Sequence, residues 1–181
     1  MRKATAHLFS SVDGVVERPD TFFRFESMGP EEAAFMAKGL ATCTDVILGR
    51  KIYQEWAGYW PTQKDDPFAA FINPAPKYVA SRTLTGDLER ENATLIDGDL
   101  IEFVRTLKEG EGGDINVDGI TVIRELILAR LLDTLTLTVH PAAAGSGRTL
   151  FESIDGPLLL DLVDSTVTKT GNAILTYRFK D

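Results

Sequence analysis

The sequence has few of the residues from which disulfide frameworks and metal centres are built. Among 181 residues there is one cysteine, Cys43, and there are two histidines, His7 and His140. A single cysteine excludes an intramolecular disulfide, and without a Cys-x-x-Cys motif a zinc site has little support. We therefore expect no metal centre, and we interpret Cys43, which precedes an apolar run, as a small buried residue.

Positive charge and long apolar segments are also scarce. Lys and Arg number 19 against 27 Asp and Glu, which gives a formal net charge of −8. Binding to a nucleic acid backbone needs a basic face, so we expect no nucleic-acid partner. No apolar run approaches the ~20 residues of a transmembrane helix, and the N-terminal segment has no hydrophobic signal-peptide core. These absences predict a cytoplasmic protein without membrane association.

What the sequence does contain is the composition of a globular domain. It is 44% hydrophobic and 25% charged, and we find no repeat, low-complexity stretch or linker. A chain of this length suits one domain with a sizeable core, so we expect residues 1–181 to form a single domain.

Hydrophobic patterns predict strands that alternate with helices along most of the chain. The predicted strands are 4–11, 45–49, 77–81, 93–97, 114–117 and 134–140, and the predicted helices are 29–41, 50–56, 99–110 and 120–131. In the first helix, Ala33, Met36, Ala37 and Leu40 form an apolar stripe at helical spacing. This order predicts an α/β fold with a mostly parallel sheet.

The C-terminal part of the chain has a different pattern. Two apolar segments flank Gly171-Asn172, which predicts an antiparallel hairpin over 158–179 at one edge of the sheet. An apolar edge of this kind pairs readily with another chain, so we expect a homodimer.

Three junctions at the carboxyl ends of predicted strands carry residues suited to phosphate binding, and ligands of open α/β sheets bind at such positions. Gly49 and Gly119 permit close approach of the backbone. The charged and hydroxyl side chains at the junctions are Arg50, Lys51, Ser81, Arg82, Thr83 and Thr121. Neither common phosphate fingerprint occurs, but three junctions together favour a nucleotide site slightly over three ordinary helix starts.

Several other residues have two interpretations each. Asp13 either faces a pocket or serves the turn before Gly14. His7 and His140 lie in strands, where packing is the commoner role. The aromatic residues of the loops either stack on a planar ring or cover the core; they are Phe22, Phe23, Phe25, Tyr59 and Trp60. Because no Ser/His/Asp set or carboxylate pair stands out, an enzyme on this chain would rely on a cofactor.

Several segments, in order along the chain, resemble proteins of the dihydrofolate-reductase-like superfamily. "VILGRKIYQEW" is similar to their G-R-x-T-[YW] segment, "SVDGVV" to the end of their first strand, and "VASRTL" to their second phosphate junction. "INVDGITVIRELILARLLDTLTLTVHPAAAGSGRTLF" resembles the reductase domain of the bacterial riboflavin-biosynthesis deaminase-reductase. The zinc motif of the deaminase domain does not occur in this sequence.

The resemblance implies a three-layer dihydrofolate-reductase-like fold and an NADPH-dependent reductase. The reaction would be hydride transfer to a small polar substrate, of the 5-amino-6-(5-phosphoribosylamino)uracil reductase type in riboflavin biosynthesis. The residues that it places at NADPH are Gly49, Arg50, Lys51, Ser81, Arg82, Thr83, Gly119, Ile120, Thr121 and Val122. Those that we expect at the substrate are Val12, Gly14, Tyr53 and Trp60, with Asp13 as the catalytic proton donor.

Two alternatives stay open. The second glycine of the family motif is Ile120 here, and a β-branched residue does not readily adopt a positive φ. That departure favours a non-catalytic nucleotide-binding protein on the same fold. Dihydrofolate reductase itself places an acid on its first helix, and Glu31 or Glu32 stands near that position. In the other interpretation, these two acids simply stabilise the helix by their position at the positive end of its dipole.

Overall fold

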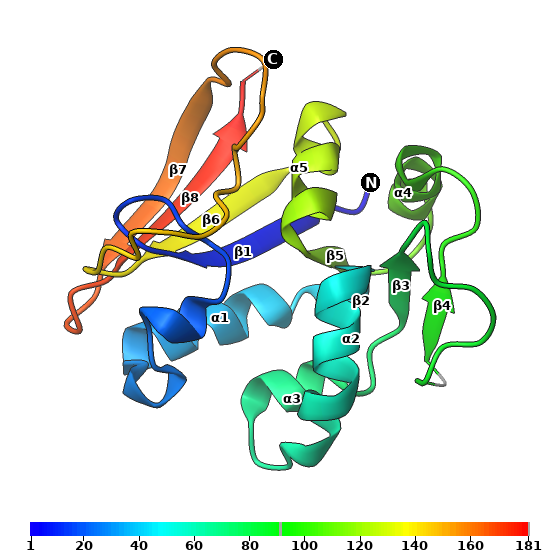
Figure 1. Cartoon of the computed structure of the whole chain (residues 1–181), viewed down its shortest axis with the longest axis horizontal. Helices are drawn as coiled ribbons and strands as arrows, with labels where there is room; N and C mark the ends of the chain where they lie inside the picture. The colour runs from blue at the N-terminus through cyan, green and yellow to red at the C-terminus, as the bar shows by residue number, and fades with distance from the viewer. Residues whose placement is uncertain (91, 181) are drawn as a thin grey trace.

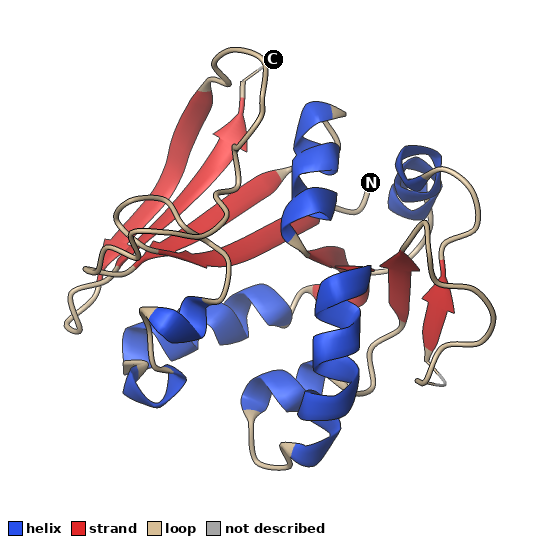
Figure 2. Ribbon diagram, in the orientation of Figure 1, coloured by secondary structure: helices blue, strands red, loops and turns tan. Residues whose placement is uncertain are grey.

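The computed structural model describes residues 1–90 and 92–180 and has a central sheet of eight strands with helices on both faces (Figures 1 and 2). The strands are β1 (Ala4–Ser10), β2 (Cys43–Gly49), β3 (Lys77–Ala80), β4 (Ala93–Leu95), β5 (Asp114–Asp118), β6 (Thr134–Val139), β7 (Leu160–Val167) and β8 (Ala173–Phe179). The helices are α1 (Pro30–Leu40), α2 (Arg50–Tyr59), α3 (Pro67–Ile72), α4 (Leu100–Glu109) and α5 (Ile120–Leu128), with short 3-10 turns η1 (Pro19–Thr21), η2 (Phe25–Ser27) and η3 (Trp60–Thr62).

Parallel pairing joins most of the sheet. In the order β4-β3-β2-β5-β1-β6-β8-β7, the strands from β4 to β6 run parallel, and β8 pairs antiparallel with both β6 and β7. This confirms the predicted α/β fold with a C-terminal hairpin. Gly171 supplies a φ of +88° in the hairpin turn, a value that glycine adopts without strain. Because parallel strands end at one edge of the sheet, the three predicted junctions share that edge.

Alternating residues of the central strand β2 divide the core into two clusters. Ile47 faces the main cluster, where α4 and α5 pack, whereas Val46 and Leu48 face a second cluster beneath α2 and α3. Helix α1 lies on the second face, because its Phe35 ring contacts His7 of β1. The two faces are thus both covered, which gives the expected three layers.

The structure corrects several details of the predicted elements. Helix α3 falls in a segment that the sequence pattern left without a helix. The predicted apolar stripe of α1 is wrong in part: Met36 and Leu40 are half-buried, but Ala33 and Ala37 are exposed, and the fully buried side chain of this helix is Glu32. Strand β2 begins at Cys43, whose side chain is half-buried rather than fully buried.

The edge strand β7 exposes apolar side chains. Among the described residues, Leu162, Val163 and Val167 of this strand are 55%, 47% and 80% exposed. Figure 2 shows β7 as the outermost strand of the sheet, with β8 as its neighbour. The expected homodimer stays a prediction, and this strand is the surface on which it rests.

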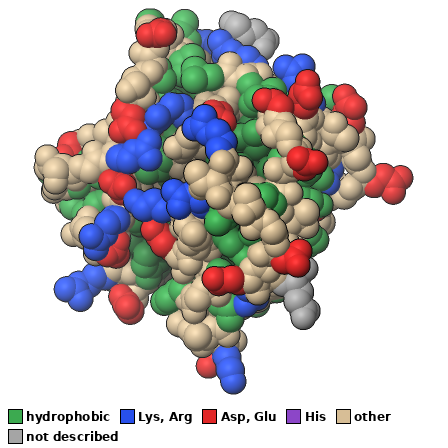
Figure 3. Space-filling model, turned by 45° about the vertical axis from the view of Figure 1, so that its right-hand side comes forward, with side chains coloured by type: hydrophobic (Ala, Val, Ile, Leu, Met, Phe, Trp, Pro, Cys, Tyr) green, Lys and Arg blue, Asp and Glu red, His purple; other side chains and the backbone are tan. Residues whose placement is uncertain are grey.

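The described residues lack two further features, a membrane-spanning helix and a cluster of metal ligands. None of the helices is both long and apolar enough to cross a bilayer. The described part of the chain holds no group of three or more potential metal-ligating side chains. On the face drawn in Figure 3, most of the basic side chains lie on the left half, with some acidic ones among them, and the right half carries mostly acidic ones.

Candidate functional site

Two strand-to-helix junctions lie side by side at the carboxyl edge of the sheet. Leu48 of β2 pairs with Asp118 of β5, so the glycines that follow these residues are neighbours. A Cβ atom on Gly119 would lie 3.1 Å from the backbone nitrogen of Gly49 and 3.3 Å from its Cα. Gly119 also has a φ of +112°, which side chains rarely permit. Glycine at 119 therefore lets the two backbones touch.

Two helices begin at these glycines, and both lack a side-chain cap. Helix α2 starts at Arg50 and α5 at Ile120, and no side chain among the described residues accepts from the first N–H groups of either helix. Uncapped N–H groups and the helix dipole favour an anion at such a position. Two adjacent N-termini can hold the two phosphates of a pyrophosphate.

The structure explains how Ile120 is accommodated. Ile120 is the first residue of α5 and is helical, so the positive φ falls on Gly119 alone. The Ile120 side chain packs against the main core. Val122 is buried nearby, with its Cγ2 atom 3.4 Å from the point that a Cβ atom on Gly49 would occupy, and Thr121 is exposed. This junction would meet a ligand through its backbone.

The cations of the β2–α2 junction already have protein partners. Arg50 Nη1 donates to Gln54 Oε1 at 3.0 Å, and Lys51 Nζ lies 3.1 Å from Glu17 Oε1. The hydrogen bond from Lys51 is the main cause that lowers the pKa of Glu17. Because both side chains are exposed, a ligand phosphate can compete for them.

The third junction follows β3, next to β2 in the sheet. Ser81 Oγ accepts hydrogen bonds from the backbone nitrogens of Thr83 (3.1 Å) and Leu84 (2.9 Å), so its oxygen holds the turn. Arg82 and Thr83 are exposed. Gly49 pairs with Ala80, so this turn begins beside the α2 N-terminus. The three predicted junctions therefore form one continuous edge.

Asp13 fastens two loops together. Its carboxylate accepts hydrogen bonds from Ser11 Oγ at 2.5 Å, from Ala144 N at 2.9 Å and from Gly145 N at 2.8 Å. The Ser11 bond first, and then the backbone bonds, hold the pKa of Asp13 at about 2. An acid this strong is ionised at neutral pH, which argues against the proton-donor role expected from the sequence.

The residues around Asp13 complete this loop contact. Gly14 adopts a φ of +83°, and the backbone nitrogen of exposed Val12 donates to Ala142 O at 2.9 Å. Gly147 approaches Val15 so closely that a Cβ on it would lie 2.6 Å from the Val15 Cγ1 atom. The glycine-rich segment near residue 145 thus has a structural role in this loop pair.

Asp118 is an acid to which the sequence analysis gave no role. It ends β5, directly before Gly119, and its Oδ2 atom accepts a hydrogen bond from Asn116 Nδ2. Burial raises the pKa of Asp118 to about 7. The carboxyl group is therefore partly protonated near neutral pH, at the strand end that faces the candidate site. The sequence signal that marks it is an acid at the end of a buried strand, directly before the glycine of a predicted junction.

Polar side chains line the face of β1 and β6 that α1 covers. His7 Nε2 lies 2.7 Å from Thr138 Oγ1, and burial and the charge of His140 lower the pKa of His7 to about 4. His140 is buried and stacks on Phe23, with ring centroids 4.0 Å apart. Phe23 also stacks on Phe9. These loop and strand rings thus pack on one another.

Glu32 ties α1 to the hairpin turn between β7 and β8. Its Oε1 atom accepts hydrogen bonds from Thr170 Oγ1 and from Asn172 Nδ2, the latter at 2.6 Å. Burial raises the pKa of Glu32, but the hydrogen bonds outweigh it and hold the value at about 2. This acid does more than interact favourably with the helix dipole, because it anchors a contact between residues that lie 140 positions apart in the sequence.

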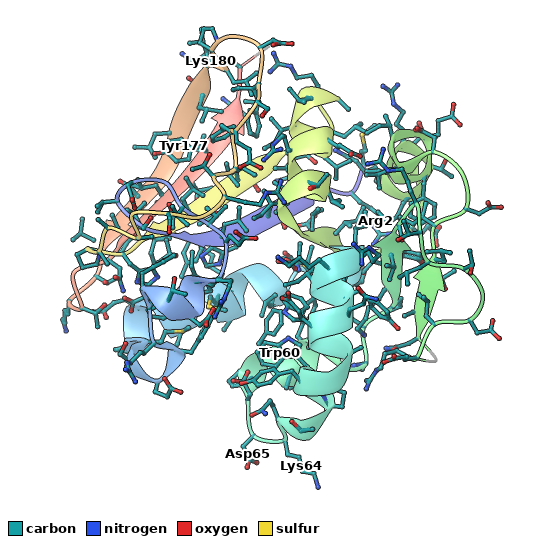
Figure 4. The ribbon with its side chains drawn as sticks, viewed as in Figure 1. Arg2, Trp60, Lys64, Asp65, Tyr177 and Lys180 are labelled. Atoms are coloured by element: carbon teal, nitrogen blue, oxygen red, sulfur yellow. The ribbon has the colours of Figure 1, made fainter. Side chains whose placement is uncertain are left out.

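Tyr53 and Trp60 lie away from the shared edge of the sheet. Tyr53 is buried in the second core cluster, and Trp60 packs against the same cluster. Figure 4 shows Trp60 in the region between α2 and α3. Both rings pack in the core beneath α2 and α3, and their expected contacts with the substrate stay a prediction.

Comparison with known proteins places the chain in a family. A family model described as the RibD C-terminal domain matches residues 2–175. The chain belongs to this family. An uncharacterised protein of Bacillus subtilis strain 168, YyaP, is 25% identical over 183 residues, which cover 98% of this chain and 95% of YyaP. Membership in the RibD C-terminal family supports a reductase-type function.

Two solved structures establish the fold class. A candidate riboflavin biosynthesis protein from Shewanella sp. PV-4 superposes with a TM-score of 0.77 at 19% identity, covering 99% of each chain. Dihydrofolate reductase from Enterococcus faecalis, complexed with NADP(H), superposes with a TM-score of 0.59 at 18% identity and covers 99% of this chain and 97% of the reductase. The RibD-type chain therefore has the dihydrofolate-reductase-like fold that its motifs imply.

Proposed function

We propose that this protein is an NADPH-dependent reductase of the 5-amino-6-(5-phosphoribosylamino)uracil reductase type. The observation that carries the proposal is the contact between Gly49 and Gly119 in front of two uncapped helix N-termini. A side chain at 119 would press on the Gly49 backbone and separate the two N-termini, so the glycine keeps them close enough to bind neighbouring phosphates. The E. faecalis neighbour, which binds NADP(H), supports a nicotinamide cofactor.

The charged residues of the shared edge fit that cofactor. Arg50 and Lys51 stand at the α2 N-terminus, where they would exchange their present partners for phosphate oxygens. Arg82 is exposed beyond β3 and would contact the 2′-phosphate that distinguishes NADPH from NADH. Ser81 and Thr83 hold the turn that presents it.

The bound nicotinamide would supply the hydride, and the protein would supply a proton and a fixed geometry. Asp118 is suited to hold that proton on its carboxyl group, because its pKa of about 7 leaves it partly protonated under working conditions. Asn116 orients the carboxyl group through its side-chain amide. Asp13 keeps the two loops next to the site together.

The environment of Glu32 favours the pyrimidine reductase over dihydrofolate reductase. The Glu32 carboxylate is committed to the hairpin turn by Thr170 and Asn172, whereas binding of a pterin would need it free. The helical conformation of Ile120 also removes the main support for a non-catalytic protein. We further propose that the protein acts in the cytoplasm as a single-domain homodimer, with β7 in the interface.

The test is NADPH consumption with two substrates. We expect oxidation of NADPH in the presence of 5-amino-6-(5-phosphoribosylamino)uracil and none above background with dihydrofolate. Turnover of dihydrofolate alone would assign the chain to the other enzyme. NADPH binding without consumption over a wide panel of pyrimidine and pteridine substrates would support the non-catalytic alternative instead.

A further inference from the structure

A small cavity lies in the second core cluster, apart from the three junctions. Its volume is about 10 Å³, and its lining includes Tyr53 and Trp60. The Tyr53 hydroxyl oxygen and the Trp60 Nε1 atom are buried and have no hydrogen-bond partner among the described residues. Buried donors are nearly always paired, so two orphaned donors at one cavity indicate an occupant of about the size of a water molecule.

The cavity is positively charged. Lys77, which is 6% exposed, and Arg90 both line it, and no acidic side chain does so in the described part of the chain. Burial, and then the charge of Arg90, lower the pKa of Lys77 to about 8. A negative occupant would relieve the repulsion between these two cations.

The hydrogen-bond acceptors near Lys77 are already used. Lys77 Nζ donates to the carbonyl oxygens of Asn73 at 3.3 Å and Ala75 at 2.7 Å. Asn92 Nδ2 donates to the same two oxygens, at 2.7 Å and 2.9 Å. Each carbonyl oxygen has two lone pairs, so neither accepts a further bond. The third N–H of Lys77 joins Tyr53 and Trp60 as a donor in need of an acceptor.

We propose that this cavity binds a small monovalent anion of the halide class, with chloride as the ordinary occupant. A halide accepts several hydrogen bonds and donates none, which matches a lining with an excess of donors. A water molecule could donate to the Tyr53 hydroxyl oxygen or to the side-chain oxygen of Asn73, another lining residue, but it carries no charge to offset Lys77 and Arg90. The anion would hold the N-terminal half of α2, which carries Tyr53, against η3 and α3.

Bromide gives a direct test in the crystal. In wild-type crystals soaked in sodium bromide, we expect an anomalous difference peak inside the cavity, between Tyr53 and Trp60. Density without an anomalous signal would identify a water molecule and overturn the proposal.

Thermal unfolding gives an independent test in solution. At matched ionic strength, sodium chloride should raise the Tm of the wild type by a few degrees relative to sodium gluconate, because an anion that binds only the folded state stabilises it. Tyr53→Phe removes one donor and should lose most of this difference. Tyr59→Phe, an exposed position on the same helix, should keep it. Equal Tm values in the two salts, or an unchanged chloride effect in Tyr53→Phe, would contradict the proposal.

Discussion

Substitution of Gly119 by alanine tests the geometry of the two joined strand ends. The new Cβ would lie 3.1 Å from Gly49 N and 3.3 Å from Gly49 Cα, and both are main-chain atoms with no rotamer by which to move aside. A non-glycine residue held at a φ of +112° adds roughly 1–3 kcal/mol of strain. With the cost of overpacking, the free energy of unfolding should fall by about 2–4 kcal/mol.

The same change should also weaken the binding of the cofactor, because relief of the steric contact moves the N-termini of α2 and α5 apart. We expect the Kd for NADPH to rise roughly 10- to 100-fold, which is about 1.4–2.8 kcal/mol. Urea unfolding measures the stability, and quenching of tryptophan fluorescence measures the binding. The matched control is Gly39→Ala in α1, where a Cβ meets nothing within 4 Å and should stabilise the helix by about 0.5–1 kcal/mol.

A Gly119→Ala variant with wild-type stability and wild-type NADPH affinity would refute this reasoning. It would mean that the backbones move apart freely and that their contact does not shape the site. A loss of stability without a loss of affinity would separate the fold from the function and would place the phosphates elsewhere.

Three further changes address other parts of the account. Asp118→Asn should lower kcat roughly 10²- to 10⁴-fold and abolish the decline in rate as the pH rises above about 7, whereas Asp114→Asn at the other end of β5 should leave the pH profile unchanged. The pKa of Glu32 in the folded protein lies below its ordinary value, so the ionised form stabilises the fold above pH 4.5, and this contribution is lost as the pH falls toward 2. Glu32→Gln should lower the free energy of unfolding at pH 7 by about 1–3 kcal/mol. It should also flatten the dependence of that free energy on pH between 4.5 and 2. Light scattering of the wild type at micromolar concentration should give a dimer mass, and Val163→Lys on the exposed edge should give a monomer; a monomeric wild type would contradict the predicted interface.

The order of strands and helices was predictable from local patterns, because buried parallel strands need continuous apolar runs and amphipathic helices need apolar residues at helical spacing. Asp99, the first residue of the predicted helix 99–110, caps α4 by accepting from the backbone nitrogens of Ile101 and Glu102. Helix α3 was missed because it is short and follows Asp66-Pro67, which resembles a loop. In the structure Asp66 is its N-cap and accepts from Phe68 N and Ala69 N.

Contacts between distant segments were not predictable in this way. Two of the partners of Asp13, Ala144 and Gly145, lie 131 and 132 positions away, and those of Glu32 lie 138 and 140 positions away. No local pattern reveals that the first acid fastens two loops or that the second replaces the expected apolar stripe of α1. The motif residues Gly49 and Gly119 could be selected from their sequence positions, but their contact depends on the pairing of β2 with β5.

The most direct test of the central claim is a fluorescence titration of the wild type with NADPH and with NADH, beside Arg82→Ala. We predict that NADPH binds more tightly than NADH. Arg82→Ala should weaken the binding of NADPH about tenfold, which is ~1.4 kcal/mol, and should have little effect on the binding of NADH. Absence of binding by either nucleotide would contradict the reductase proposal and the interpretation of the three junctions as one cofactor site.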